Sequence, residues 1–289
     1  MVEWAGNLKK EKGIMKRVLT IQDISCLGKC SLTIALPVIS ALGAETVILP
    51  TAVLSTHTMF KNFTVKDLSD QLEPITAHWK SEGVEFDAIY TGYLGTIEQI
   101  DQVKAIFEMF KGKDTKIIVD PVMADNGKLY PAFDMDYVKK NAQLCASADI
   151  IVPNITEACF MTGMEYKEKY NEDYIKELLS KLNDLGADVS VLTGVSLSKG
   201  KTGVMGYDST VDEYYVYQND RIDTSYHGTG DLFSSTCVGQ MMKGKDWRDA
   251  MRIAADYTAH TIRVTLDNPK KPWYGVDFEA TIPELIGME

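Results

Sequence analysis

Short apolar runs alternate with longer amphipathic runs along most of this chain, and that alternation restricts the possible folds more than any other feature. The short runs, expected to be strands, are residues 18–22, 46–49, 88–91, 116–119, 150–152 and 189–192. The longer runs, expected to be helices, are residues 30–42, 65–81, 97–111, 136–145, 157–162 and 172–185. Such alternation is typical of βαβ units, and strands that are apolar on both faces need helices on both sides of the sheet. The pattern predicts an α/β fold with three layers, α/β/α, around a central, mostly parallel sheet.

The pattern changes after residue 193. Residues 202–207 and 213–217 are expected to form a hairpin, and residues 218–225 a polar loop. Two helices, residues 230–243 and 246–266, are expected to complete the core. The sequence contains no low-complexity linker, internal repeat or block of like charges. We therefore expect a single domain over residues 17–289, preceded by an N-terminal extension over residues 1–16.

Composition excludes several classes of protein. The net charge of −11 and the lack of a basic patch argue against a nucleic-acid partner. No stretch approaches the 18 or so apolar residues of a membrane span, and residues 1–12 are too polar for a signal peptide. The cysteines are odd in number and scattered, which favours reduced thiols in the cytoplasm over disulfides or a zinc site. They are Cys26, Cys30, Cys145, Cys159 and Cys237.

Polar residues are concentrated where the expected strands end. In open parallel sheets, ligands bind beyond the carboxyl ends of the strands, so these loops are the first place to seek a site. They are expected to contain Asp23, residues 55–58, residues 92–93, Asp120, Asn154 and residues 193–194.

The motif Gly228-Thr229-Gly230-Asp231 stands directly before an expected helix. Glycines allow a tight turn with exposed N–H groups, and the positive end of the helix dipole suits an anion such as phosphate. A carboxylate beside that anion is unfavourable for simple binding, but it suits a general base that takes a proton from an attacking hydroxyl. The alternative is a glycine turn in which Asp231 merely stabilises the start of the helix.

Two further strand ends carry candidate ligands. Asp120 and Asp125 can approach a metal or phosphates, since Mg²⁺ needs few protein ligands when phosphate oxygens and water complete its shell. The alternative there is an Asp-Pro turn. Asn154 and Glu157 have the spacing of a helix capping box, and the alternative places both at a phosphate–metal site, with Glu157 holding a Mg²⁺-bound water.

Neither a P-loop nor a Gly-x-Ser-x-Gly nucleophile motif occurs in the sequence. The ordered set of strand-end motifs instead resembles the pyridoxal kinases of the ribokinase-like superfamily, from about residue 17 to 266. The motifs that carry the resemblance are Ile21-Gln22 followed by Gly28, Ser55-Thr56-His57-Thr58, Thr91-Gly92-Tyr93, Asp120-Pro121-Val122-Met123, Pro153-Asn154-x-x-Glu157 and Gly228-Thr229-Gly230-Asp231.

The resemblance implies a ribokinase-like fold and ATP-dependent phosphorylation of the 5′-hydroxymethyl group of a B6 vitamer. It implies that Asp231 is the catalytic base and that the backbone N–H groups of Gly228, Thr229 and Gly230 form an anion hole. It further implies a homodimer and Mg²⁺ bound with ATP. The residues implied at the metal and phosphates are Asp120, Asn154 and Glu157, and Thr193 is implied to contact the nucleotide.

The resemblance also implies a place for the pyridine ring. The residues expected around it are Asp23, His57, Thr58 and Tyr93. Alternatively, His57 anchors its own loop and Tyr93 has a packing role. Asp23 stands where pyridoxal kinases commonly have a serine, so we hypothesise that the chain uses pyridoxamine better than pyridoxal. Val152 stands where the family often has a threonine that helps bind a monovalent cation, which leaves K⁺ to Asp120 and backbone carbonyls.

Other functions remain open at this point. A hydroxymethylpyrimidine kinase of thiamine synthesis would share the fold, anion hole and reaction. That family often has cysteine at the position of Asp231, although His227 resembles the pyrimidine enzymes. A sugar kinase would carry an additional β-sheet lid, and no long insertion lies between Gln22 and Thr46. A non-catalytic vitamer-binding protein on the same fold would have no need of Asp231.

Overall fold

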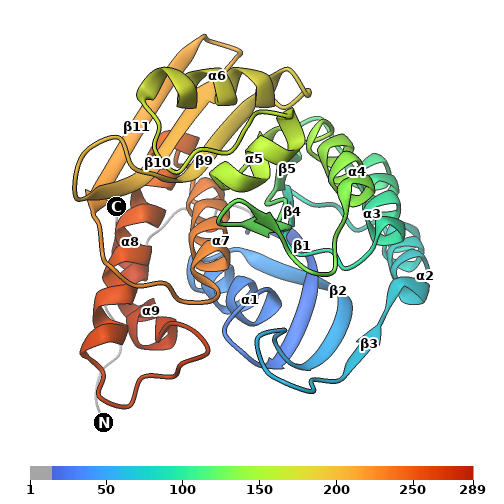
Figure 1. The fold of residues 1–289 in the computed structure, drawn as a ribbon. Helices are drawn as coiled ribbons and strands as arrows, with labels where there is room; N and C mark the ends of the chain where they lie inside the picture. The colour runs from blue at the N-terminus through green and yellow to red at the C-terminus, as the bar shows by residue number, and fades with distance from the viewer. Residues whose placement is uncertain (1–14, 289) are drawn as a thin grey trace, which may run out of the picture.

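The computed structural model describes residues 15–288, so most of the expected N-terminal extension, residues 1–14, lies outside the described part (Figure 1). The strands are β1 (Arg17–Leu27), β2 (Glu45–Thr56), β3 (Val65–Asp67), β4 (Ala88–Thr91), β5 (Lys116–Val119), β6 (Ala124–Asp125), β7 (Lys128–Leu129), β8 (Ile150–Ile151), β9 (Val189–Val195), β10 (Lys201–Asp208) and β11 (Glu213–Asp220). The helices are α1 (Leu32–Ala41), α2 (Ser69–Ser81), α3 (Ile97–Phe110), α4 (Met135–Cys145), α5 (Ile155–Thr162), α6 (Glu172–Asn183), α7 (Thr229–Met242), α8 (Trp247–Asp267) and α9 (Phe278–Ile286).

A single sheet has the strand order β11-β10-β9-β8-β5-β4-β1-β2-β3. The strands from β2 to β9 in this order pair in parallel, while β3 and the β10–β11 hairpin add antiparallel pairs at the two edges. From β1 the chain first adds β2 on one side of β1, and the strands from β4 onward are then added on the other side of β1. The order therefore reverses beside β1, which is where ligands bind in open α/β sheets.

Alternate residues of the central strands point to opposite faces of the sheet. Leu19 of β1 and Ile117 of β5 belong to a core shared with helices α2 to α6. Tyr90 of β4 and Ile118 of β5 belong to a second core shared with α1, α7 and α8. The helices accordingly cover both faces, as Figure 1 shows. The predicted three-layer α/β/α fold with a mostly parallel sheet is confirmed.

Two strands are longer than the sequence indicated, and this changes the position of Asp23. We expected strands at residues 18–22 and 46–49, with Asp23 in the following loop. In the structure β1 and β2 continue as a pair as far as Leu27 and Thr56, with a register shift after Gln22. A polar residue in one strand and Pro50 in the other suggested an early end. Pairing between the two strands overrides both signals, so Asp23 lies within β1.

Other differences lie at the periphery. The helix expected at residues 65–81 begins only at residue 69, because residues 65–67 pair with β2 as strand β3. The small β6–β7 hairpin and helix α9 were not predicted. Gly194, expected after a strand, lies within β9. The β10–β11 hairpin is confirmed, but its second strand extends to residue 220 and shortens the expected polar loop.

Candidate active site

The N-terminus of α7 differs from those of most other helices in the described chain. The helices α3, α4, α5, α6 and α8 each begin with a side chain that accepts a hydrogen bond from a first-turn N–H. The residue that precedes α7 is Gly228, and because it has no side chain it accepts no such hydrogen bond. Since the first N–H groups of a helix have no partner within it, those of α7 remain available to a ligand.

Gly228 is required here for two reasons. Its φ of 80° is a conformation that residues with a Cβ rarely adopt, and a Cβ would run into the backbone carbonyl of Lys29. By contrast, the space around the Cα of Gly230 is open, and this residue is exposed. The side chain of Thr229 is turned back, because its hydroxyl donates to the carbonyl of Tyr226. The loop therefore leaves one open approach to the backbone of the expected anion hole.

Asp231 lies in the first turn of α7 and is partly buried. The backbone of Ser31 favours the charged form of the Asp231 carboxylate and so opposes a rise of its pKa. Burial first, and then the nearby charges of Asp120 and Asp23, raise the pKa of Asp231 to about 8. A carboxylate whose pKa lies near neutrality is a better proton acceptor than an ordinary aspartate.

Asp120 lies just after β5 and is buried. The hydroxyl of Ser234 on α7 donates to its Oδ2 at 2.7 Å. Burial and repulsion from Glu157 raise the pKa of Asp120. A buried carboxylate in such surroundings is stabilised by a cation, and its hard oxygens suit Mg²⁺. The donor set at Asp120 therefore fits a magnesium ion whose remaining ligands are phosphate oxygens and water.

Asn154 and Glu157 form the capping box that their spacing predicted at the start of α5. Glu157 also accepts hydrogen bonds through Oε1 from the N–H groups of Met123 and Ala124. With both oxygens engaged by backbone donors, Glu157 suits an indirect contact with a metal, through water, better than direct coordination. Among the described residues, no group of three or more His, Cys, Asp or Glu side chains is placed to hold a metal ion alone.

Thr193 lies beside Asn154, to which it is joined by an isolated β-bridge. Its N–H donates to the carbonyl of Pro153 at 3.0 Å. Next to it opens a hollow of about 540 Å³. The residues that line this hollow come from the ends of β9, from β10 and from the segment after β11: Gly194, Ser196, Thr202, Arg221, Ile222, Asp223, Thr224 and Ser225.

Asp23 is only 4% exposed and is held by two hydroxyl groups. Ser31 Oγ donates to Oδ1 at 2.6 Å, and Ser25 Oγ donates to Oδ2 at 3.2 Å. Burial raises the pKa of Asp23. Burial raises the pKa of Tyr93, and the charge of Asp23 raises it further.

His57 is buried, and both of its ring nitrogens have partners. Nε2 lies 3.0 Å from the carbonyl oxygen of Tyr274 and must be the N–H donor, while Nδ1 accepts from the N–H of Met59. Burial lowers the pKa of His57, so its ring is neutral. The histidine thus anchors its own loop, as one of the two interpretations expected, and the ring of His227 packs against its ring with the centroids 4.2 Å apart. Thr58 follows in the turn and is exposed.

Two residues at this site were missed in the sequence. Ser31 donates to Asp23, and Ser234 donates to Asp120. Ser234 follows Asp231 by three residues in the same expected helix, and that helical spacing was the available signal. No local pattern marks Ser31, whose partner Asp23 lies within strand β1.

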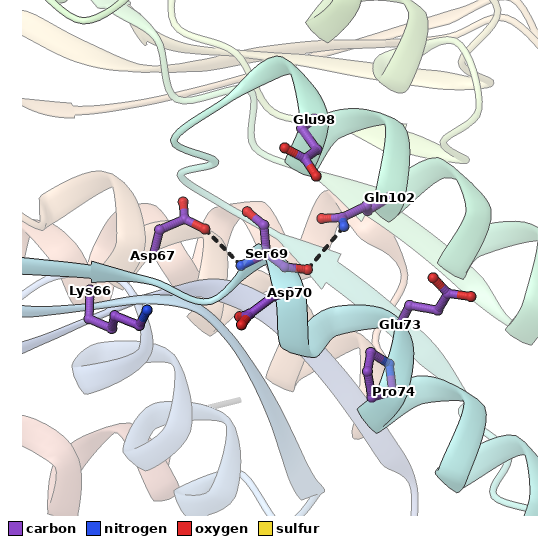
Figure 2. Close-up of a pocket in the computed structure, with 8 residues that line it drawn as sticks. All are labelled: Lys66, Asp67, Ser69, Asp70, Glu73, Pro74, Glu98 and Gln102. Atoms are coloured by element: carbon purple, nitrogen blue, oxygen red, sulfur yellow. Dashed lines mark hydrogen bonds between the residues drawn. The ribbon is translucent and has the colours of Figure 1, made fainter.

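A second hollow, of about 460 Å³, lies away from these residues, between β3, α2 and α3 (Figure 2). Four exposed carboxylate residues contribute to its wall, and Figure 2 shows Ser69 bonded to Asp67 and Gln102 across it. The residues that line the hollow are Lys66, Asp67, Ser69, Asp70, Glu73, Pro74, Glu98 and Gln102.

No helix in the described part of the chain is long and apolar enough to cross a membrane.

Comparison with known proteins identifies relatives over most of the chain. A family profile described as phosphomethylpyrimidine kinase matches residues 35–273. A candidate phosphomethylpyrimidine kinase from Bacteroides thetaiotaomicron, crystallised with pyridoxal, has 36% sequence identity, a TM-score of 0.89, and coverage of 94% of this chain and 96% of that chain. The pyridoxal kinase from Lactobacillus plantarum has 29% identity, a TM-score of 0.86, and coverage of 94% and 97%. Pyridoxine kinase from Bacillus subtilis is 30% identical over 63% of this chain and 66% of its own length.

Proposed function

The chain belongs to the phosphomethylpyrimidine kinase family, and from this premise we propose that it transfers the γ-phosphoryl group of ATP to the 5′-hydroxymethyl group of a B6 vitamer. One observation carries the proposal. A carboxylate with a raised pKa, Asp231, stands in the first turn of a helix whose N–H groups have no side-chain cap. The relatives crystallised with pyridoxal or called pyridoxal kinase support the choice of vitamer.

In the proposed reaction Asp231 accepts the proton of the vitamer hydroxyl while that oxygen attacks the γ-phosphorus. The bond from phosphorus to the bridging oxygen of ADP breaks, and ADP leaves. The backbone N–H groups of Gly228, Thr229 and Gly230 stabilise the charge on the phosphoryl oxygens during transfer. The close approach of Gly228 to the carbonyl of Lys29 supports the proposal that these donors are in position before the substrate arrives.

We propose that Asp120 holds Mg²⁺ with the ATP phosphates, and that Glu157 contacts it through a bound water. The ion would neutralise the phosphate charge that the buried acids otherwise repel. If K⁺ also binds, Asp120 and backbone carbonyls are its candidate ligands, since Val152 offers no side-chain oxygen. Removal of divalent cations with EDTA should abolish turnover, and K⁺ should be tested separately against Na⁺.

The nucleotide is proposed to lie along Asn154 and Thr193, with its base and ribose in the adjacent hollow of about 540 Å³. This hollow includes Arg221 to Ser225, within the segment that follows the β10–β11 hairpin. Its position beside Thr193 supports the assignment, because both lie at the carboxyl end of β9.

The pyridine ring is proposed to lie near Asp23 and Tyr93, with the ring face of His57 and the side chain of Thr58 at its edge. Asp23 is proposed to favour an amine, and therefore pyridoxamine over pyridoxal. Comparison of kcat/KM for the two vitamers in wild type and Asp23→Ser tests this, and an unchanged preference would reject it. A homodimer in the cytoplasm is proposed from the resemblance; sedimentation analysis tests the former.

A second candidate is a hydroxymethylpyrimidine kinase, which the description of the matching family favours. His227 before the glycine loop agrees with it, whereas Asp231 in place of a cysteine favours the B6 reaction. The deciding experiment is an ADP-release assay with MgATP on pyridoxamine, pyridoxal, pyridoxine and hydroxymethylpyrimidine in parallel. Turnover of the B6 compounds supports the proposal. Turnover of the pyrimidine alone transfers the chain to the second candidate.

A further inference from the structure

The segment that joins α8 to α9, residues 268–277, holds two loops that border the candidate active site. It contacts the turn between β1 and α1 through Lys29, whose Nζ donates to Asp277 Oδ1. It contacts the turn after β2 through His57, whose Nε2 donates to the carbonyl of Tyr274 at 3.0 Å. This segment is remote in sequence from both loops, and the reaction proposed above assigns it no part.

Lys29 is held by two carboxylates of unequal exposure. Its Nζ lies 3.1 Å from Asp277 Oδ1 and 2.7 Å from Glu279 Oε2. The side chains of Lys29 and Asp277 are only 12% and 16% exposed, whereas that of Glu279 is 58% exposed. Water and salt screen a sheltered ion pair much less than an exposed one, so the bond to Asp277 is the stronger anchor.

The anchor of Lys29 is itself rigidly placed. The side-chain amide of Asn268 donates to Asp277 Oδ2 at 2.6 Å, and the N–H of Asp277 donates to the buried hydroxyl of Thr265 at the end of α8. Gly275 packs on the stem of the lysine so closely that a Cβ there would meet the Cβ of Lys29. The lysine is therefore fixed both at its ammonium group and along its side chain.

The backbone of Lys29 in turn supports the glycine loop. Its carbonyl oxygen occupies the place where a Cβ on Gly228 would lie. We infer that Lys29 is a positioning residue: its ion pair with Asp277 holds its carbonyl against Gly228 and so fixes the first N–H groups of α7 at the transferring phosphoryl. The inference rests on the proposed function, which assigns those N–H groups to the anion hole.

The first test is Lys29→Met in the full chain, in a steady-state assay with MgATP and pyridoxal. Methionine keeps the backbone and an unbranched side chain but removes the charge. We expect kcat to fall about tenfold, with KM for the vitamer changed less than about threefold, because placement of the transferring group is lost rather than binding. Glu279→Gln is the matched control. It removes the exposed partner of the same lysine and should keep kcat within about twofold of wild type.

A double-mutant comparison separates positioning from a general loss of stability. In Gly228→Ala the added Cβ already displaces the carbonyl of Lys29, so Lys29→Met should lower kcat less than about twofold in that background. The inference is overturned if Lys29→Met lowers kcat by the same factor in both backgrounds. It is also overturned if Lys29→Met alone keeps kcat within about threefold of wild type.

A second variant covers the case in which Lys29→Met fails to fold, as thermal unfolding would reveal. Gly275→Ala keeps the ion-pairing groups but pushes on the stem of Lys29, and it should lower kcat in the wild-type background and much less beside Gly228→Ala. Equal losses in the two backgrounds would again overturn the inference. Failure of the proposed function would appear separately, as absence of wild-type turnover on every B6 vitamer. The variants are then compared on hydroxymethylpyrimidine, with the same expected ratios.

Discussion

Two groups of acidic side chains on this molecule invite comparison. One consists of Asp67, Asp70, Glu73 and Glu98, which are exposed around the hollow between β3, α2 and α3 (Figure 2). The other consists of Asp23, Asp120, Glu157 and Asp231, which lie within β1, just after β5 and in the first turns of α5 and α7, and burial raises the pKa of each.

The difference shows that acidic residue type alone does not make a chemical site. Water screens the exposed group, so those carboxylates gain little by binding a cation or a proton. The buried group lacks that screening, and each of its members is more stable beside a proton, a metal ion or a hydrogen-bond donor. A hollow lined by carboxylates need not contain the chemistry, whereas the loss of solvent around charged groups indicates where it lies.

The largest difference between the two groups should appear in the rate of the reaction. We expect Asp231→Asn to lower kcat about a thousandfold, because the amide keeps the size of the side chain but accepts no proton. Asp70→Asn, from the exposed group, is the matched control and should retain wild-type kcat. Steady-state ADP release measures both. Turnover of Asp231→Asn within a few-fold of wild type would remove Asp231 from the role of base.

A smaller effect on the rate is expected from Gly228, which precedes the first turn of α7 and therefore positions Asp231. In Gly228→Ala the new Cβ meets the carbonyl of Lys29, so the start of α7 must shift. We expect kcat/KM to fall about a hundredfold, since misplaced donors lose much of their effect on the transferring phosphoryl. Gly244→Ala is the control. It also has positive φ, but nothing lies within 4 Å of its added Cβ. Equal losses in the two variants would attribute the effect to backbone strain alone.

Most of the fold could be predicted, because it depends on local patterns. The alternation of strand and helix runs specified the layers, and the order of the strand-end motifs specified the family. The strand boundaries that failed were those decided by pairing: β1 and β2 continue together past residues 22 and 49, where the expected strands ended. Residues 65–67 became strand β3 for the same reason.

The site was predictable as a set of residues but not as a network. Asp231 was recognisable from the glycine loop, and Asn154 with Glu157 from their capping spacing. The hydrogen bond from Ser31 to Asp23 depends on how the β1–α1 turn lies against β1, which no sequence spacing encodes. One partner of His57 is similarly remote, since the carbonyl of Tyr274 comes from the segment between α8 and α9.

The pH dependence of the reaction should separate the two groups further. A base must be deprotonated to act, and the pKa of Asp231 is raised to about 8. We therefore expect kcat/KM to rise about tenfold per pH unit up to about pH 8 and then to level off. The profile of Asp70→Asn should be superimposable on that of wild type. A profile that is flat from pH 6 to pH 9 would contradict the raised pKa.

Stability should show the smallest difference between the two groups, and it should change with pH in the opposite direction to activity. Since the pKa of Asp231 is higher in the folded chain than its usual 3.8, the folded state binds more protons than the unfolded state between those values. The free energy of unfolding should therefore fall as the pH rises toward about 8. Asp231→Asn removes the buried charge and should exceed wild type by about 1 kcal/mol at pH 8, with less difference at pH 5.

Urea unfolding of wild type, Asp231→Asn and Asp70→Asn at the two pH values measures this effect. The exposed substitution should change the free energy of unfolding by less than about 0.5 kcal/mol at either pH. If Asp231→Asn were destabilising at pH 8, the charged carboxylate would be a net stabilising element, favoured by the positive end of the α7 dipole. The charge of Asp231 would then not lower the free energy of unfolding, and the buried and exposed carboxylates would differ only in where they lie.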